Sequence, residues 1–218
     1  MAEILIYLAG GAALVLAWYF FFVRYNRARA IEVLRWIETS LAGHGHVTGI
    51  RWVAPSRFQV PIRLNTSVFR RPTMLVEITP REIPFRWLLD WLRKRPETVT
   101  FEADLDSVPG FNLMVRNHRW WGRTSRKLSP DPKSWVFDQT TPLLLTTRYG
   151  KRGHTTAMLN ALFRCREKEF LKLFFRRQSP HFSATLPLEA VASANEGENL
   201  FAVLLEVASG ASTSRESL

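Results

Sequence analysis

Apolar residues fill the first part of the chain without interruption. Residues 4–23 carry no charged side chain, and eleven of them are Leu, Ile, Val or Phe. A helix of this length spans about 30 Å, which matches the thickness of a bilayer's hydrocarbon core. At roughly −0.3 to −0.6 kcal/mol each, those side chains favour insertion by about 3 to 7 kcal/mol. The pattern predicts a transmembrane anchor over residues 1–23.

Two other kinds of segment contain long apolar runs. A cleaved signal peptide begins with basic residues and ends at a small-residue cleavage site. This chain has Glu3 and no basic residue before the run, and no small-residue site precedes the arginines that follow. A buried core helix seldom stays apolar on every face for about 20 residues. The pattern therefore favours an anchor over both alternatives.

After Val23 the apolar residues recur at helical spacing, with charged residues between them. The apolar stripe consists of Ala30, Val33, Leu34, Trp36, Ile37 and Leu41. No Pro or Gly interrupts the segment before Gly43, so one helix is expected to continue from the span as a stalk over residues 24–43. Such a stiff connection would hold the following domain close to the bilayer.

From residue 57 the period changes to two, which indicates a strand. Pro61 within this strand argues that it lies at a sheet edge, and residues 47–53 would pair with it around a turn at residues 54–56. Further strands are predicted at residues 74–79, 99–106, 111–117, 143–148, 170–177 and 182–188, and helices at residues 85–95, 154–168 and 198–208. Gly210 would end the last helix, with residues 211–218 as a disordered tail.

These elements predict an α+β fold, in which the transmembrane helix continues into a domain at residues 44–210 with a mixed, mostly antiparallel sheet. A helix followed by a hairpin occurs at residues 29–64 and again at residues 154–188. Both hairpin turns contain proline and serine. Two duplicated α-β-β halves would explain this repeated pattern, and so would chance.

The charge distribution predicts an orientation. All 30 basic residues and 18 of the 19 acidic residues follow Val23, so residues 24–218 have a net charge of +12. Positive segments stay on the cytoplasmic side, which would place the N-terminus outside and the domain in the cytosol, under a plasma membrane or a bacterial inner membrane. A basic domain of this kind favours anionic partners. The single cysteine excludes an internal disulfide framework.

Tryptophans and cations alternate in two segments, at residues 84–95 and 117–127. Indole rings prefer the headgroup region, and each nearby cation adds about 1 kcal/mol on an anionic surface. For residues 85–95 the sequence favours core packing over lipid contact, and for Trp120 and Trp121 it favours neither. The candidate membrane-facing residues are Trp18, Tyr19, Arg24, Arg27, Arg29, Trp87, Trp91, Arg93, Lys94, Arg95, Arg119, Trp120, Trp121, Arg123, Arg126 and Lys127.

Three carboxylates alternate along one predicted strand, at Glu102, Asp104 and Asp106. With His118 on a returning strand they could act as acid and base in an enzyme at the membrane surface. The favoured interpretation is an exposed sheet face whose acids meet basic residues across the hairpin. The spacing of histidines and cysteine fits no zinc site, and no phosphate-binding loop occurs, so neither a metal nor a cofactor is predicted.

The sequence thus favours a membrane protein that is not an enzyme and whose basic domain binds anionic lipid or another membrane protein. Two alternatives stay open: the carboxylate enzyme, and an assembly subunit that binds an acidic partner. The tether and the scattered cations disfavour nucleic acid. The small residues Ala9, Gly10, Gly11 and Ala13 would let two anchors pack as a homodimer, or would simply make the span flexible.

Overall fold

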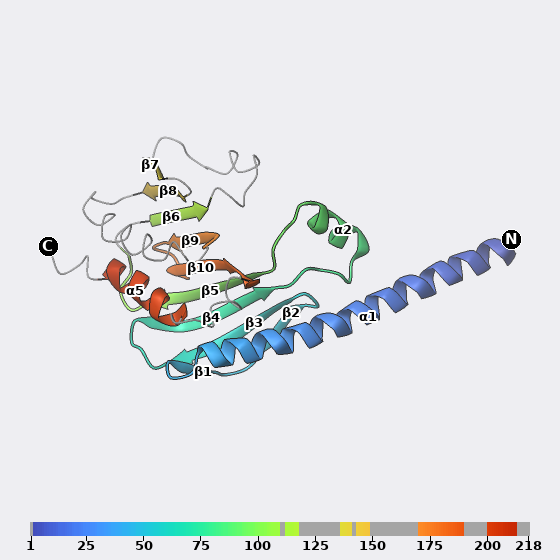
Figure 1. Ribbon diagram of the computed structural model, residues 1–218, viewed down its shortest axis with the longest axis horizontal. Coiled ribbons are helices and arrows are strands. Elements are labelled where there is room, and N and C mark those ends of the chain that lie inside the picture. The colour runs from blue at the N-terminus through green and yellow to red at the C-terminus, as the bar shows by residue number, and fades with distance from the viewer. Residues whose placement is uncertain are drawn as a thin grey trace.

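The computed structural model describes residues 2–109, 112–117, 136–140, 143–148, 170–189 and 200–212. Its long N-terminal helix and antiparallel sheet make the fold α+β, as the sequence predicts (Figure 1). The helices are α1 (Ala2–Ser40), α2 (Pro84–Leu92) and α5 (Leu200–Ser212). The strands are β1 (Gly45–Val47), β2 (Arg51–Ala54), β3 (Arg57–Leu64), β4 (Phe69–Glu77), β5 (Thr98–Leu105), β6 (Asn112–Asn117), β7 (Val136–Thr140), β8 (Leu143–Arg148), β9 (Lys172–Phe175) and β10 (Phe182–Pro187).

All described strands join one sheet in the order β1-β3-β4-β5-β10-β9-β6-β8-β7, with β2 also paired to β3. Every pairing among them is antiparallel. The expected hairpin between residues 99–106 and 111–117 is wrong, because β10 and β9 lie between β5 and β6. Alternating residues determine which face of a strand is buried but not which strand pairs with it. The expected hairpin was inferred from the order of the strands along the chain, and that order does not predict the pairing here.

Proline in β3 does not mark a sheet edge, which corrects another expectation. β3 pairs with β4 on one side and with β1 and β2 on the other. β2 pairs with β3 as far as Gln59, β1 pairs with it from Ile62, and Pro61 falls in the gap between them. The carbonyl of Pro61 accepts a hydrogen bond from the Thr48 N–H at 3.0 Å. A break in the outer pairing therefore accommodates the proline.

Helix α1 runs without a break for 39 residues, which confirms the predicted continuity of span and stalk. It is long and apolar enough to cross a membrane, and no residue of its most apolar 18-residue stretch is buried by the rest of the chain. The part after Val23 packs on the sheet, where Ala30, Val33, Ile37 and Leu41 are buried. Gly43 follows the helix with a φ of 85°, a backbone conformation that favours glycine.

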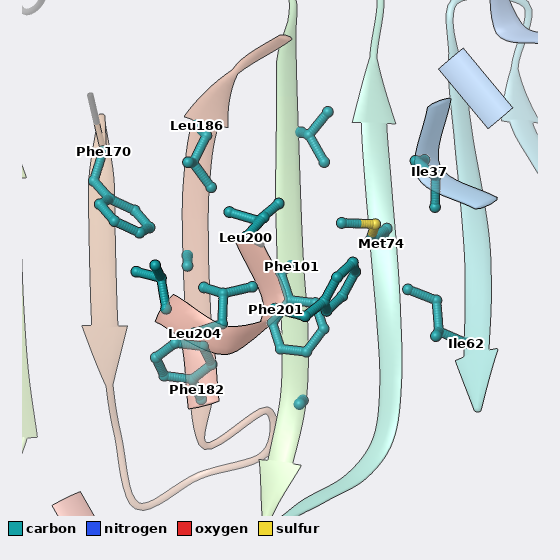
Figure 2. Close-up of a cluster of buried hydrophobic side chains, with 14 of the residues drawn as sticks. Ile37, Ile62, Met74, Phe101, Phe170, Phe182, Leu186, Leu200, Phe201 and Leu204 are labelled. Carbon is teal, nitrogen blue, oxygen red and sulfur yellow. The ribbon is translucent and has the colours of Figure 1, made fainter. Parts of the chain in front are cut away.

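The hydrophobic core lies on one face of the sheet, beneath α1 and α5 (Figure 2). In β5, alternate residues from Val99 to Leu105 are buried, and Phe101 contacts Phe201 of α5 at a ring-centroid distance of 6.1 Å. Figure 2 shows Leu200, Phe201 and Leu204 of α5 above the central strands, with Ile37 of α1 and Ile62 of β3 on one side of the cluster. One side of α1 from Ala30 to Ile37, with Leu41 just after the helix, thus belongs to the domain core.

The C-terminal end of the described chain differs from expectation. Helix α5 passes through Gly210 and ends at Ser212, so Gly210 does not end it. An interior glycine weakens a helix by about 1 kcal/mol, which packing of a largely buried helix can offset. The strand β7 was not predicted. The predicted helix at residues 154–168 lies outside the described residues, so the proposed duplication of α-β-β halves stays a prediction.

Candidate membrane-docking site

The connection between β4 and β5, residues 78–97, leaves the sheet and folds against α1. The indole Nε1–H of Trp18 donates a hydrogen bond to the backbone carbonyl oxygen of Arg81 at 3.0 Å. The Trp18 ring also lies 6.2 Å from the ring of Trp87 in α2. These contacts place α2 beside the apolar part of α1, at the level of Trp18 (Figure 1).

A buried polar pair fixes the same connection to α1 eight residues later. Asn26 is 0% exposed and Glu82 is 5% exposed, and the Asn26 Nδ2 donates to Glu82 Oε2 at 2.9 Å. Among the residues that the structure describes, none hydrogen-bonds to the Asn26 Oδ1. Buried polar atoms stabilise a contact only in one geometry, since a misplaced partner leaves both unsatisfied. The pair therefore sets the register between α1 and the connection.

Charged residues continue this contact along α1. Glu97 lies between two arginines, with Oε1 3.5 Å from Arg81 Nη2 and Oε2 3.9 Å from Arg29 Nε. The Arg81 guanidinium also lies 5.0 Å from the centroid of the Tyr25 ring. The hydrogen bond with Glu32 raises the pKa of Arg29 above its usual value, burial opposes the rise, and the charge of Glu97 adds to it. Arg29 consequently stays cationic at every physiological pH.

Helix α2 owes its boundaries to local sequence. Pro84 occupies its first turn, where a missing backbone N–H costs nothing. At the other end the N–H of Arg95 donates to the Asp90 carbonyl and that of Lys94 to the Trp91 carbonyl, both at 3.0 Å. This is the Schellman arrangement, which usually has glycine at the position that Lys94 occupies. Lys94 has a φ of 47°, so a cationic side chain is held in a backbone conformation that disfavours it.

The apolar side of α2 does not pack into the core, which corrects the interpretation favoured from sequence. No residue of α2 is buried. Phe85 is 72% exposed, Trp91 64% and Leu92 62%, and Leu88 is exposed as well. A small domain seldom leaves such a patch in water without a partner. The amphipathic pattern was right, but the surface that covers its apolar side is not the sheet.

The acids around α2 are all engaged, whereas several cations are not. Glu82 binds Asn26, Glu97 binds two arginines, Asp90 forms an ion pair with Arg95 at 3.4 Å, and Glu77 forms one with Arg57. Within the part of the chain that the structure describes, no ion pair forms at Arg24, Arg27, Arg86, Arg93 or Lys94. The unpaired charge of the described residues around α2 is therefore positive.

Most of the membrane-facing candidates from sequence gather here. Tyr19, Arg24 and Arg27 are exposed on α1, and Trp18 and Arg29 are half-buried in the contact with the connection. The other candidates described lie in α2 or just after it: Trp87, Trp91, Arg93, Lys94 and Arg95. Arg119, Trp120, Trp121, Arg123, Arg126 and Lys127 lie outside the described residues, as does His118. Ala9, Gly10, Gly11 and Ala13 are exposed along α1, where a dimer stays a prediction.

Four residues of the contact were missed by sequence reasoning: Asn26, Arg81, Glu82 and Glu97. A lone asparagine among the arginines that follow an apolar span was the available signal, because a buried amide needs a partner. Glu82 lies in a connecting segment with no period, so nothing local pairs it with a helix 56 residues away. Tertiary contact, which local patterns do not encode, brings them together.

The carboxylate strand has a different setting. Glu102 and Asp104 lie on the sheet face opposite the core, and Asp106, beyond the end of β5, forms an ion pair with Arg70. The basic partners come from β4 and the turn before β10, which corrects the expected hairpin partner in β6. Asp104 Oδ1 lies 3.9 Å from His181 Nδ1, which accepts a hydrogen bond from the Leu105 N–H at 3.2 Å. Among the described residues no group of three or more His, Cys, Asp or Glu could hold a metal ion.

Comparison with known proteins assigns the chain to no family. No protein-family model matches the chain, and no curated protein matches it either.

Proposed function

We propose that this protein is a single-pass membrane protein whose basic cytosolic domain binds the anionic lipid surface beside its anchor. The exposed apolar side of α2, held against α1 at Trp18, is the observation that carries the proposal. Lipid is the covering surface that requires no second protein, because α1 already brings α2 to the bilayer. On this account, Glu3 lies on the outer side and the domain on the cytoplasmic side.

The depth of the contact agrees with an interfacial helix. Trp18 precedes Val23, the end of the uncharged run, by five residues, or about 7 to 8 Å along the helix axis. Amphipathic helices in the plane of a membrane place their apolar side about 5–10 Å below the headgroup boundary. If residues 4–23 span the bilayer, α2 therefore lies at the depth where such helices bind.

The unbroken helix α1 also supports an anchor over a cleaved signal peptide. Ala30, Val33 and Ile37 of the helix pack in the core, and Trp18 binds the connection before α2. Cleavage after the apolar run would remove the Trp18 contact and leave α2 without its partner. A segment that is removed needs no such contact with the mature domain.

Anionic lipid fits the charge around α2. Arg24, Arg27, Arg86, Arg93 and Lys94 form no ion pair with described residues, and each cation near an anionic surface contributes about 1 kcal/mol. The tether adds to this by keeping the local lipid concentration high. The contribution from charge is screened by salt, whereas the apolar contribution is not.

The test uses the full-length protein in vesicles. With the native Cys165 replaced by serine, Leu92→Cys carries an environment-sensitive fluorophore, and lipids with quenchers at known depths report its immersion. We expect strong quenching about 5–10 Å below the headgroup boundary. Ser67→Cys is the matched control, because residue 67 is exposed in the β3–β4 connection at the other end of the sheet. No quenching at position 92 would overturn the proposal, and a cross-link there to another protein would indicate a membrane-protein partner instead.

A second measurement tests the electrostatic part. The double variant Arg86→Gln, Arg93→Gln should lose about 2 kcal/mol of docking free energy in anionic vesicles. The salt concentration that releases half of the quenching should fall accordingly. Arg63→Gln removes an exposed cation that lies in β3, away from α2, and should change nothing. Equal docking to neutral and anionic vesicles would remove charge from the account.

A further inference from the structure

The hairpin of β2 and β3 presents a second apolar surface that the sequence did not indicate. Ile50, Trp52 and Val53 are exposed, Val53 to 53%. The β2–β3 register shifts between Trp52 and Ala54, so Val53 is the extra residue of a bulge. Bulges redirect a side chain away from the sheet, and they recur where a strand serves a function other than pairing.

The pairing register places this hairpin at the same end of the sheet as α2. Arg57 of β3 is opposite Glu77 of β4, and Glu77 is opposite Thr98 of β5. The hairpin turn before Arg57 and the connection that carries α2 therefore emerge from one sheet end. Figure 1 shows the β2–β3 turn at this end of the sheet, which points toward the N-terminal half of α1.

Residue types at the hairpin match those around α2. Trp52 lies opposite Phe58, with ring centroids 5.1 Å apart, which holds the indole in place. Its neighbour Arg51 is exposed and forms no ion pair with described residues. An indole, a branched aliphatic side chain and a cation are the groups that bind at the headgroup boundary.

We propose that the β2–β3 hairpin, through Trp52 and Val53, is a second lipid contact that docks on the same leaflet as α2. This inference rests on the proposed function, since it requires that α1 span the bilayer. A rigid domain held at α1, at α2 and at the hairpin has one orientation on the membrane. Contact at α1 and α2 alone would leave rotation about the line that joins them.

The experiment labels full-length Cys165→Ser protein at Val53→Cys, with Leu92→Cys and Ser67→Cys reported in parallel. In anionic vesicles we expect quenching at position 53 by shallow quenchers, weaker than at position 92 and clearly above position 67. A second variant, Trp52→Ser with Val53→Ser, changes two side chains of an edge strand, and thermal unfolding checks that the domain stays folded without the contact between Trp52 and the buried Phe58. It should leave quenching at position 92 unchanged and increase the rotational freedom of a spin label at position 67 on vesicles.

The outcomes separate the two proposals. Quenching at position 92 without quenching at position 53 overturns the hairpin contact and leaves the docking of α2 intact. Absence of quenching at both positions overturns both. A disulfide cross-link between two molecules of the unlabelled Val53→Cys variant, without lipid quenching at position 53, would also overturn the inference, because it assigns the hairpin to a second copy of the chain.

Discussion

Asn26 and Glu82 are buried polar residues that join α1 to the connection before α2. Replacement of Glu82 by Gln supplies an N–H that can donate to the unpaired Asn26 Oδ1, so Glu82→Gln should change the free energy of unfolding by less than about 1 kcal/mol. Asn26→Asp removes the donor and brings two carboxylates together, which should cost about 2 to 3 kcal/mol. Thermal unfolding in detergent micelles measures both.

The double variant provides the control for this pair. In Asn26→Asp with Glu82→Gln the donor and acceptor exchange places, so the hydrogen bond re-forms. Most of the stability lost in Asn26→Asp should return. Additive losses would show that the two side chains do not act as a pair in the folded protein.

Lys94 exemplifies a residue whose backbone and side chain have opposed requirements. Glycine adopts its φ of 47° without strain, so Lys94→Gly should raise the free energy of unfolding by about 1 kcal/mol. The same change removes a cation, so docking on anionic vesicles should weaken. Lys94→Ala keeps the strain and loses the charge, and should weaken docking without the gain in stability. A stabilised Lys94→Gly that docks as strongly as the native protein would remove Lys94 from the site.

At the scale of elements, the sequence predicted the position of helix α2 but not what contacts its apolar side. Its period of apolar residues predicted a helix at residues 85–95, and the structure has one at Pro84–Leu92. The pattern favoured packing on the core, and that interpretation was wrong, because a sheet and a lipid surface select the same apolar residues. The pairing of β5 with β10 was missed for a related reason, since partners distant in sequence leave no local pattern. Helix α1 was predicted well because span and stripe are both local.

The apolar side of α2 should be essential for docking but not for folding. Phe85→Ser with Trp91→Ser changes two side chains that are exposed in the structure, so thermal unfolding of the domain should shift by little. Loss of their transfer to lipid should reduce docking by several kcal/mol. Quenching at position 92 checks the docking. A variant that unfolds instead would show that these side chains contribute to the core.

At the scale of the whole molecule, the apolar run of residues 4–23 and the stripe that packs on the sheet lie on one helix, so their spacing is fixed. Four alanines inserted after Val23 would lengthen α1 by about 6 Å and rotate the domain by about 40° relative to the span. Trp18 could then no longer reach the Arg81 carbonyl, and the probe at position 92 should become shallower by about that length. Four alanines inserted after Gly43, beyond the helix, change neither spacing and serve as the control. An unchanged depth after the first insertion would contradict the rigid connection.

Helix α1 also determines when this protein can fold during synthesis. Residues 30–41, which supply part of the core, are made before any strand, and α5, which covers the same sheet face, is among the last described segments to be made. Because α5 leaves the ribosome after the strands that it covers, the apolar face of the sheet lacks this cover through most of translation. On the proposed function, in which residues 4–23 span the bilayer, a nascent chain whose first element is already inserted completes its core at the bilayer rather than in free solution.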